Sequence, residues 1–559
     1  MMNIKRLNPM LGLCAAALLA GTACVDLEVA NLNAPDRERA IRTPGDVEAL
    51  VSGAYRNWWS NQSSTTPNMV MSCVADNHTS SWGNFGMRDN CSEPRIAWNN
   101  APTYGSRSAA ANPWNRSYGS LAAVRSGLQA INDGLRIQEP GGPDNTERLV
   151  LFGKLIQGLS FATLAVTFDR SFVIDDATTD EDISALETID YNQMWAEAEA
   201  KFAEVIQGAQ GASFTIPSDW VGGGGDWSGP RMAEVTRALR TRYRTQIPRT
   251  LADQQALNWS AILADATTGI DETFGVEYVQ GGSTSWVRMW PKVYSYIRGW
   301  SRTDYRRIGP SDASGNYQKW ISAPLDQRTP FEIDTDDRRI TAGSPTSDGK
   351  HQTFMGNSPF PADRGIYHYS HYIDTRWEYL WQDFRYETFW PNVTPMEMEF
   401  IVAEANYWMG DKAATMETVN KYRTSSGELP PFTDVNGVAP GGDRCVPKMA
   451  NGSCGDLWEA YKYEKRMELF MMGNGTEYFD DRGWEDLVQH SWTQLPIPGQ
   501  ELELLLMDIY TFGGPGGAGA APDVIDDFSP AGIRSKLRAI ELWSEVHGNT
   551  DADQIPRRR

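Results

Sequence analysis

The chain has 559 residues, enough to bury a large core, and its 41% apolar and 22% charged residues are ordinary for a globular protein. A formal net charge of −21 argues against nucleic acids and anionic lipid headgroups as partners, because the long-range field would repel both. The 21 Trp and 21 Tyr residues indicate that some rings serve a flat, amphipathic ligand such as a sugar, while the others fill the core.

The N-terminus has the pattern of a targeting segment. Lys5 and Arg6 precede a short apolar stretch and then the small residues Gly-Thr-Ala before Cys24. We therefore predict a signal peptide over residues 1–23, with Cys24 as the acylated first residue of a bacterial lipoprotein and residues 24–42 as its leader. Ordinary cleavage at the same bond, with Cys24 left free, is the alternative. No later segment looks apolar enough to cross a membrane, so the acyl chains would be the only anchor.

Helical periodicity predicts most of the region from residue 43 to 273. Thr43-Pro44-Gly45-Asp46 has the residues of a helix start. The helices that we expect cover residues 43–59, 114–135, 147–168, 191–206, 231–245 and 251–266. Residues 61–113 lack such a pattern, so we expect a loop-rich insert there.

Four cysteines remain after processing. They are Cys73, Cys91, Cys445 and Cys454. An even number in an exported chain indicates disulfides, with three possible pairings. The local pairs Cys73–Cys91 and Cys445–Cys454 would each close a short loop. Because no Cys-x-x-Cys occurs and no His lies near these cysteines, a zinc site is not expected.

Two regions combine aromatic rings with Asn, Asp and Arg in loops. One is the insert, and the other lies between residues 274 and 391, where short aromatic and polar runs predict loops and short strands. Sugars present apolar C–H faces that stack on rings, whereas their hydroxyl groups pair with polar side chains. The candidate ligand-binding residues are Trp82, Phe85, Trp98, Trp286, Arg288, Trp290, Tyr296 and Trp320.

A helical hairpin is predicted after this irregular region. Its helices cover residues 395–409 and 412–424, and Gly410-Asp411 makes the turn, with Asp411 as N-cap. The hairpin has about the length of one tetratricopeptide repeat, and the earlier helices can be paired into roughly three more. Periodicity alone therefore predicts a mostly α fold built as an array of helical hairpins.

The stretch from residue 457 to 498 contains an amphipathic helix, a glycine-bearing turn and an extended segment bracketed by prolines. Three- and four-residue spacing places four side chains on one buried face: Tyr463, Met467, Phe470 and Met471. Charged pairs flank this face, namely Lys462 with Arg466 and Glu464 with Glu468. They indicate a helix held to its neighbours by ion pairs.

This stretch resembles the C-terminal signature of the SusD/RagB family of outer-membrane nutrient-binding lipoproteins. The family pattern is a Glu-x-Arg-x-Glu-Leu helix, a Gly turn, an aromatic residue followed by Asp, an Arg-x-Trp and a Pro-Ile-Pro. The matching residues are Glu464, Arg466, Glu468, Leu469, Gly473, Phe479, Asp480, Arg482, Trp484, Pro496, Ile497 and Pro498. Asp337-Arg338-Arg339, Glu397 and Ala403-Glu404-Ala405 match as well. Met472 and Glu477 stand where the family has an acid and an Arg, so a bridge between those positions is absent.

The resemblance implies four tetratricopeptide-like units forming a scaffold, with an irregular α/β region packed against it. It divides the chain into a helical region (43–273), a ligand-side region (274–391) and the signature region (392–501). Beyond Glu501, within residues 502–559, we expect a flexible linker at residues 513–517 and a tail with a helix over residues 530–546.

The resemblance also implies a function. A surface-exposed lipoprotein, anchored in the outer membrane through Cys24, would capture an oligosaccharide and deliver it to a TonB-dependent, SusC-like transporter. RagB-type members bind peptides, which leaves a peptide as the alternative ligand.

Catalytic chemistry finds no support in the sequence. No nucleophile elbow, zinc-protease, phosphate-loop or dinucleotide-binding motif occurs in a suitable context. His368 and His371 alternate as in a strand, and the acidic turn at residues 334–337 lacks the Gly and Glu of an EF-hand, so we expect no metal or cofactor. Nothing selects the two opposed carboxylates of a glycosidase. An exported helical-toroid glycosidase or lyase, and a structural surface protein without a small ligand, remain as alternatives.

Overall fold

The structure is a computed structural model that describes residues 43–521, except 139, 184, 281–285, 287, 358, 360–368 and 474. The predicted signal peptide, Cys24 with the leader over 24–42, and the helix over 530–546 lie outside the described residues.

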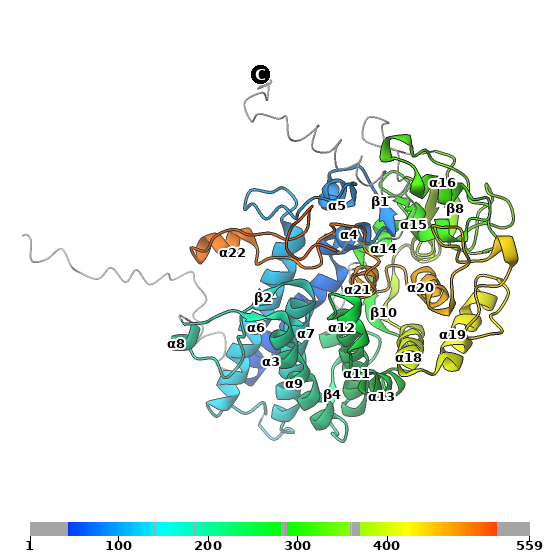
Figure 1. The fold of residues 1–559 in the computed structure, drawn as a ribbon. Coiled ribbons are helices and arrows are strands. Elements are labelled where there is room, and N and C mark those ends of the chain that lie inside the picture. Colours follow the sequence, from blue (N-terminus) through cyan, green and yellow to red (C-terminus); the bar gives the residue numbers. More distant parts are fainter. Residues whose placement is uncertain are drawn as a thin grey trace, which may run out of the picture.

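The long helices form a continuous series of four hairpins. The pairs are α3 (Pro44–Ser63) with α6 (Ser108–Asn132), α7 (Thr146–Thr167) with α9 (Tyr191–Ala209), α11 (Gly229–Gln246) with α13 (Trp259–Thr267), and α18 (Pro395–Met409) with α19 (Lys412–Ser425). Each hairpin packs on the next through α6–α7, α9–α11 and α13–α18. The series runs from the blue to the yellow helices in Figure 1. The predicted mostly α fold with tetratricopeptide-like units is confirmed.

Local sequence explains where several helices begin and end. Thr43 and Asp190 each form a capping box, in which the cap side chain accepts a backbone N–H while the third helical residue bonds back. Gly410 ends α18 in the left-handed conformation, at φ 92°, and Asp411 then caps α19.

The central helix α7 is more apolar than we expected. In the described part of the chain it is long and apolar enough to cross a membrane, although 89% of its most apolar window is buried inside the molecule. The expectation that no later segment has such a composition was therefore wrong. The helix is apolar all round because it is packed between α6 and α9.

Two helical predictions need correction. The insert at residues 61–113 contains α4 (Thr65–Val74), η1 (Asn84–Gly86), α5 (Met87–Cys91) and the first turns of α6. The helix predicted over residues 251–266 is two helices, α12 (Leu251–Gln255) and α13, because Asn258 caps a new helix start at Ala261 N–H.

The irregular region lies between the third and fourth hairpins. Strands β6 (Phe274–Tyr278) and β10 (Thr388–Val393) pair in antiparallel fashion, so the chain leaves and rejoins the array at neighbouring points. The region contains α14 (Trp290–Ser295), β7 (Arg302–Thr303), α15 (Tyr305–Ile308), η2 (Gly309–Ser311), α16 (Asn316–Ser322), η3 (Leu325–Gln327), β8 (Gln352–Phe354), β9 (Tyr372–Asp374) and α17 (Tyr379–Gln382). We call residues 274–393 the inserted region. A second buried cluster joins Tyr305, Ile308 and Trp320 of this region to Tyr463 and Met467 near the C-terminal end.

The remaining elements are short. They are β1 (His78–Thr79), β2 (Arg170–Ser171), α8 (Asp180–Ile183), β3 (Ile189–Asp190), β4 (Thr215–Ile216), α10 (Ser218–Val221), β5 (Trp227–Ser228), η5 (Gly442–Arg444), α20 (Leu457–Glu468), α21 (Thr476–Gly483) and α22 (Gly499–Leu504). The strands pair two by two, β1 with β7, β2 with β3, β4 with β5 and β8 with β9. No larger sheet is present among the described residues.

The signature helix is α20, and its four predicted core residues are all buried. The helix ends at Glu468, so Phe470 and Met471 lie in the following turn rather than on the helix. The predicted ion pairs are present. Lys462 contacts Asp486 and Arg466 contacts Asp481, while Glu464 and Glu468 both contact Arg339.

The glycine-rich segment after Glu501 is not a free linker in the structure. A Cβ atom on Gly513 would lie 2.9 Å from Trp492, and one on Gly514 would lie 2.8 Å from Ala97. Glycine is required here because the turn packs directly against these neighbours.

Candidate functional site

The partly exposed aromatic rings of the inserted region form a contiguous group with one ring from the N-terminal loops, in which Phe85, Tyr294 and Trp300 all touch one another. Ring centroids lie 5.7 Å apart between Phe85 and Trp300, 4.8 Å between Trp300 and Tyr294, and 5.7 Å between Tyr294 and Trp290. We call these four residues the aromatic strip. Each ring is partly buried against its neighbours, and each keeps part of its surface exposed.

Arg288 extends the strip in a second direction. Its guanidinium carbon lies 4.4 Å from the ring centroid of Trp290, 4.8 Å from that of Tyr386 and 5.0 Å from that of Tyr278. Tyr386 in turn lies 5.0 Å from Trp381, whose side chain is 39% exposed. A half-buried cation held among three rings is stabilised by cation–π attraction and can still offer N–H groups to a ligand.

Helix α14 fixes the middle of the strip. Trp290 and Tyr294 are four residues apart and therefore share one face of the helix. Lys292 is fully buried, where its ammonium group donates to the carbonyl oxygens of Met471 and Met472 and lies 4.1 Å from the Trp377 ring centroid. Burial holds the pKa of Lys292 well below its usual range.

Glu477 and Lys292 bind the same turn after α20. The buried side chain of Glu477 accepts the Met471 N–H, while Lys292 binds the carbonyl groups of the turn. A lysine from the inserted region thus contacts the turn that follows the signature helix.

The loop that supplies Phe85 is bonded at two points to the segment that carries Trp300. The Trp82 indole N–H donates to the Gly299 carbonyl over 3.1 Å, and the Ser80 hydroxyl donates to the Trp300 carbonyl over 2.7 Å. Phe85 adopts a left-handed backbone conformation, at φ 57° and ψ 12°, which is costly for a large side chain. Ring position here is maintained by the surrounding contacts rather than by local preference.

Four of the eight predicted ligand-binding residues are brought to one surface. Phe85 and Trp290 belong to the strip, Arg288 extends it, and Trp82, 36% exposed, is bonded to the loop of Trp300.

The other four predicted residues are buried, which corrects their assignment to a ligand surface. Trp98 packs edge-on against Tyr104 and Trp492, and Trp286 packs against Tyr55 and Trp59. Tyr296 donates its hydroxyl to Tyr386 beneath the strip, and Trp320 packs on Tyr305 in the second buried cluster. The first three rings belong to the main core, so large rings attach these loops to the body of the molecule.

Sequence reasoning missed Tyr278, Trp381 and Tyr386. The dense aromatic run from Trp377 to Tyr386 was a usable signal, because an irregular segment rarely buries so many rings at once. The pairing of β6 with β10, which brings Tyr278 opposite Thr388, could not be seen from periodicity.

Polar clusters elsewhere are engaged in structural contacts. Arg444 donates to Asp334 and Asp336 in the acidic turn, over 3.0 Å in each case. His371 immediately precedes strand β9 rather than lying in it as the alternation predicted, and His368 lies outside the described residues. The described residues contain no group of three or more His, Cys, Asp or Glu side chains placed to hold a metal ion.

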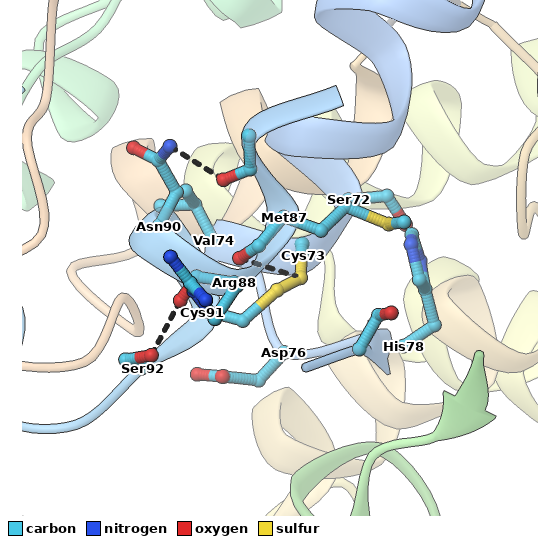
Figure 2. Close-up of a disulfide and its surroundings, with 12 residues drawn as sticks. Ser72, Cys73, Val74, Asp76, His78, Met87, Arg88, Asn90, Cys91 and Ser92 are labelled. Carbon is cyan, nitrogen blue, oxygen red and sulfur yellow. Dashed lines mark hydrogen bonds between the residues drawn. A yellow bond between two sulfur atoms is a disulfide. The ribbon is translucent and has the colours of Figure 1, made fainter. Parts of the chain in front are cut away.

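The four cysteines form two local disulfides in the structure. Cys73 is bonded to Cys91 and Cys445 to Cys454, with Cα atoms 5.3 Å and 5.8 Å apart. Figure 2 shows the first bond, which ties the end of α4 to α5 just after the Phe85 turn.

Comparison with known proteins yields matches at the level of structure. No protein-family model matches the chain, and no curated protein matches it. A SusD superfamily protein from Parabacteroides distasonis is 11% identical, with a TM-score of 0.53, over 82% of this chain and 97% of that one. A SusD-like carbohydrate binding protein from Bacteroides fragilis is 14% identical, with a TM-score of 0.51, over 89% and 98% of the two chains. A SusD-like protein from the same species is 13% identical, with a TM-score of 0.51, over 79% and 86%.

The structural similarity establishes the fold, whereas identities of 11–14% do not establish the activity. The chain has the SusD-like fold over most of its length, and the fold expected from the sequence resemblance is confirmed.

Proposed function

We propose that this protein is a surface-exposed, lipid-anchored member of the SusD/RagB family that binds an oligosaccharide and delivers it to a TonB-dependent, SusC-like transporter. The observation that carries the proposal is the aromatic strip, presented on a SusD-like fold. One structural neighbour is described as a carbohydrate binding protein, which supports the ligand class.

The strip suits a chain of sugar rings. Trp290, Tyr294 and Trp300 follow one another at spacings of 4.8 to 5.7 Å, so successive sugar units could stack along them through their apolar C–H faces. Arg288 supplies hydroxyl-binding N–H groups beside the rings. Binding of this kind is reversible and needs no covalent step.

Lipid anchoring and the transporter partner rest on the sequence resemblance. An acyl group on Cys24 would hold the body at the membrane surface, and the net charge of −21 suits a body that does not itself bind anionic lipid. Mass spectrometry of the mature N-terminus tests the acyl group. Co-purification with a barrel encoded by a neighbouring gene tests the partner.

The test of ligand binding uses the mature chain with Cys24→Ser, which is free of lipid. We expect glycan arrays to identify a bound oligosaccharide and calorimetry to give its affinity. Trp290→Ala and Trp300→Ala should each weaken binding by about 5- to 10-fold, since one stacked ring contributes about 1 kcal/mol. Trp195→Ala, the same change on the partly buried side of α9, is the matched control and should leave the affinity unchanged.

Three results would contradict the proposal. Retention of peptides with no glycan bound would favour the RagB-type alternative. A fall in the viscosity of a polysaccharide solution on incubation with the protein would favour a glycosidase or lyase. Full affinity in both strip variants would show that the rings are not the binding surface.

A further inference from the structure

A cavity lies away from the aromatic strip, where three parts of the chain meet. Its volume is about 300 Å³, at the lower end of the range for small-molecule sites. Its walls come from the turn after α4, from α15 and α16 of the inserted region, and from the signature helices α20 and α21. No residue of the strip lines it. We call it the junction cavity.

Both disulfides constrain walls of the junction cavity. Residues 75–77 form one wall and lie inside the loop closed by the Cys73–Cys91 bond. Figure 2 shows Asp76 of this wall near that bond. Residues 447–451 form another wall and lie inside the short loop closed by Cys445 and Cys454. A cross-link reduces the freedom of the loop that it closes, so these two walls are preorganised.

The charged side chains of the cavity are balanced and paired. Four acidic residues (Asp76, Glu459, Asp481 and Asp486) and four basic residues (Arg306, Arg307, Lys448 and Arg466) line it, in a chain with 21 more acids than bases.

Several of these side chains are held in place by ion pairs, some with residues behind the wall. Arg306 lies 2.5 Å from Glu93, Arg466 lies 2.5 Å from Asp486, and Lys462 lies 2.9 Å from Glu459. The side chains of Arg306 and Arg466 remain about one fifth exposed.

This lining disfavours a charged ligand. Its acidic and basic groups are equal in number, so an ion that enters would lose its hydration without a net opposite charge to compensate it. A hydroxyl group both donates and accepts, so a polyhydroxylated molecule can bond to carboxylates and guanidinium groups at once. Tyr317, Ile321 and Pro310 supply apolar surface for the carbon skeleton of such a molecule.

We propose that the junction cavity is a second binding site, which takes one neutral, polyhydroxylated ligand of about the size of a single sugar ring. The site goes beyond the proposed function, because it neither uses the aromatic strip nor requires an oligosaccharide.

The test measures single sugars on the full mature chain with Cys24→Ser. Glucose, galactose and mannose are titrated by calorimetry and ligand-detected NMR, each beside its uronate and its amino sugar. We expect at least one neutral sugar to bind with a stoichiometry of one, and its two charged counterparts to bind at least 10-fold more weakly. Absence of binding by all three neutral sugars, or equal affinity for a charged counterpart, would overturn the proposal.

Variants then locate the site. Ala450→Trp, on the disulfide-closed loop, should fill the cavity and weaken single-sugar binding at least 10-fold. Ile321→Trp, on α16 in another wall of the cavity, repeats the test if the first variant does not fold. Ala122→Trp, on the exposed side of α6, is the control and should bind as the parent does.

Trp290→Ala on the strip separates the two proposals. It should leave single-sugar binding intact even if oligosaccharide binding is lost. If only the proposed function is correct, Trp290→Ala should weaken the binding of single sugars and oligosaccharides alike. Full binding in both cavity variants would overturn the junction cavity as the site.

Discussion

Arg339 joins two sequence motifs that lie far apart in the chain. Its side chain is fully buried, and it lies 2.7 Å from Asp337, 2.6 Å from Glu464 and 2.9 Å from Glu468. The Asp-Asp-Arg-Arg segment and the signature helix, which were recognised separately in the sequence, therefore form one cluster. Buried carboxylates of this kind depend on their cation, because an unpaired buried charge is costly.

Replacement of Arg339 should be strongly destabilising. We expect Arg339→Met to lower the free energy of unfolding by about 3–5 kcal/mol, because Asp337 loses its cation in the core while Glu464 and Glu468 keep only Arg423 and Arg376. Denaturant or thermal unfolding followed by circular dichroism measures the change. Arg444→Met is the matched control, since Arg444 pairs with Asp334 and Asp336 at the surface, and it should cost less than about 1 kcal/mol. Equal losses in the two variants would contradict the role assigned to the buried cluster.

Asp480 should make stability depend on pH. Burial is the main cause that raises the pKa of Asp480 to about 7, and the Glu404 charge adds to it against the opposing effect of Lys465 2.9 Å away. The unfolded chain has a carboxyl pKa of about 4, so the folded protein binds more protons between the two values and loses stability as the pH rises from about 4 to about 7.

Asp480→Asn removes this titration. The difference in the free energy of unfolding, parent minus variant, should therefore fall by about 2–3 kcal/mol between pH 5 and pH 8. Unfolding curves of both proteins over this pH range measure it. A difference that stays constant or rises with pH would refute the raised pKa.

At the scale of elements, backbone conformation decides what a glycine contributes. Gly410 ends α18 at φ 92°, whereas Gly53 lies inside α3, and neither has an atom within 4 Å of the position that a Cβ would occupy. An added Cβ atom would therefore clash at neither position, so the two alanine substitutions differ only in how well alanine adopts the local backbone conformation.

The two glycines should respond with opposite signs. Gly410→Ala should lower the free energy of unfolding by about 1 kcal/mol, because alanine is strained in the left-handed region. Gly53→Ala should raise it by up to about 1 kcal/mol, because alanine is the better helix former. Parallel urea titrations measure both changes, and stabilisation by Gly410→Ala would show that the hairpin turn tolerates another conformation.

Element types were predictable where local sequence determined them. The spans of α7, α9, α11, α18 and α19 follow from period and caps, and they differ from the predicted ranges by only a few residues. The break between α12 and α13 was missed, because the apolar spacing continues across Asn258 while its side chain starts a new helix. A capping side chain can start a new helix even where the apolar spacing continues, and the local geometry decides whether it does.

At the scale of the whole molecule, sequence reasoning found the scaffold and only half of the site. Composition identified the aromatic loops, but it could not tell Trp290, which is partly exposed, from Trp286, which is buried. That distinction depends on long-range contacts. One is the hydrogen bond from Lys292 to the carbonyl oxygen of Met472 in the turn after α20, 180 positions away in the chain. Long-range register of this sort leaves no periodic trace in the sequence.

The β6–β10 pair has an evolutionary consequence. The segment between these strands enters and leaves the hairpin array at one place, yet α13 and α18 pack together regardless of what separates them in the chain. The exposed rings of this excursion can therefore vary while the packing of α13 on α18 and the buried contacts of Lys292 and Arg339 are kept. The exposed surface can in this way change without a change of architecture.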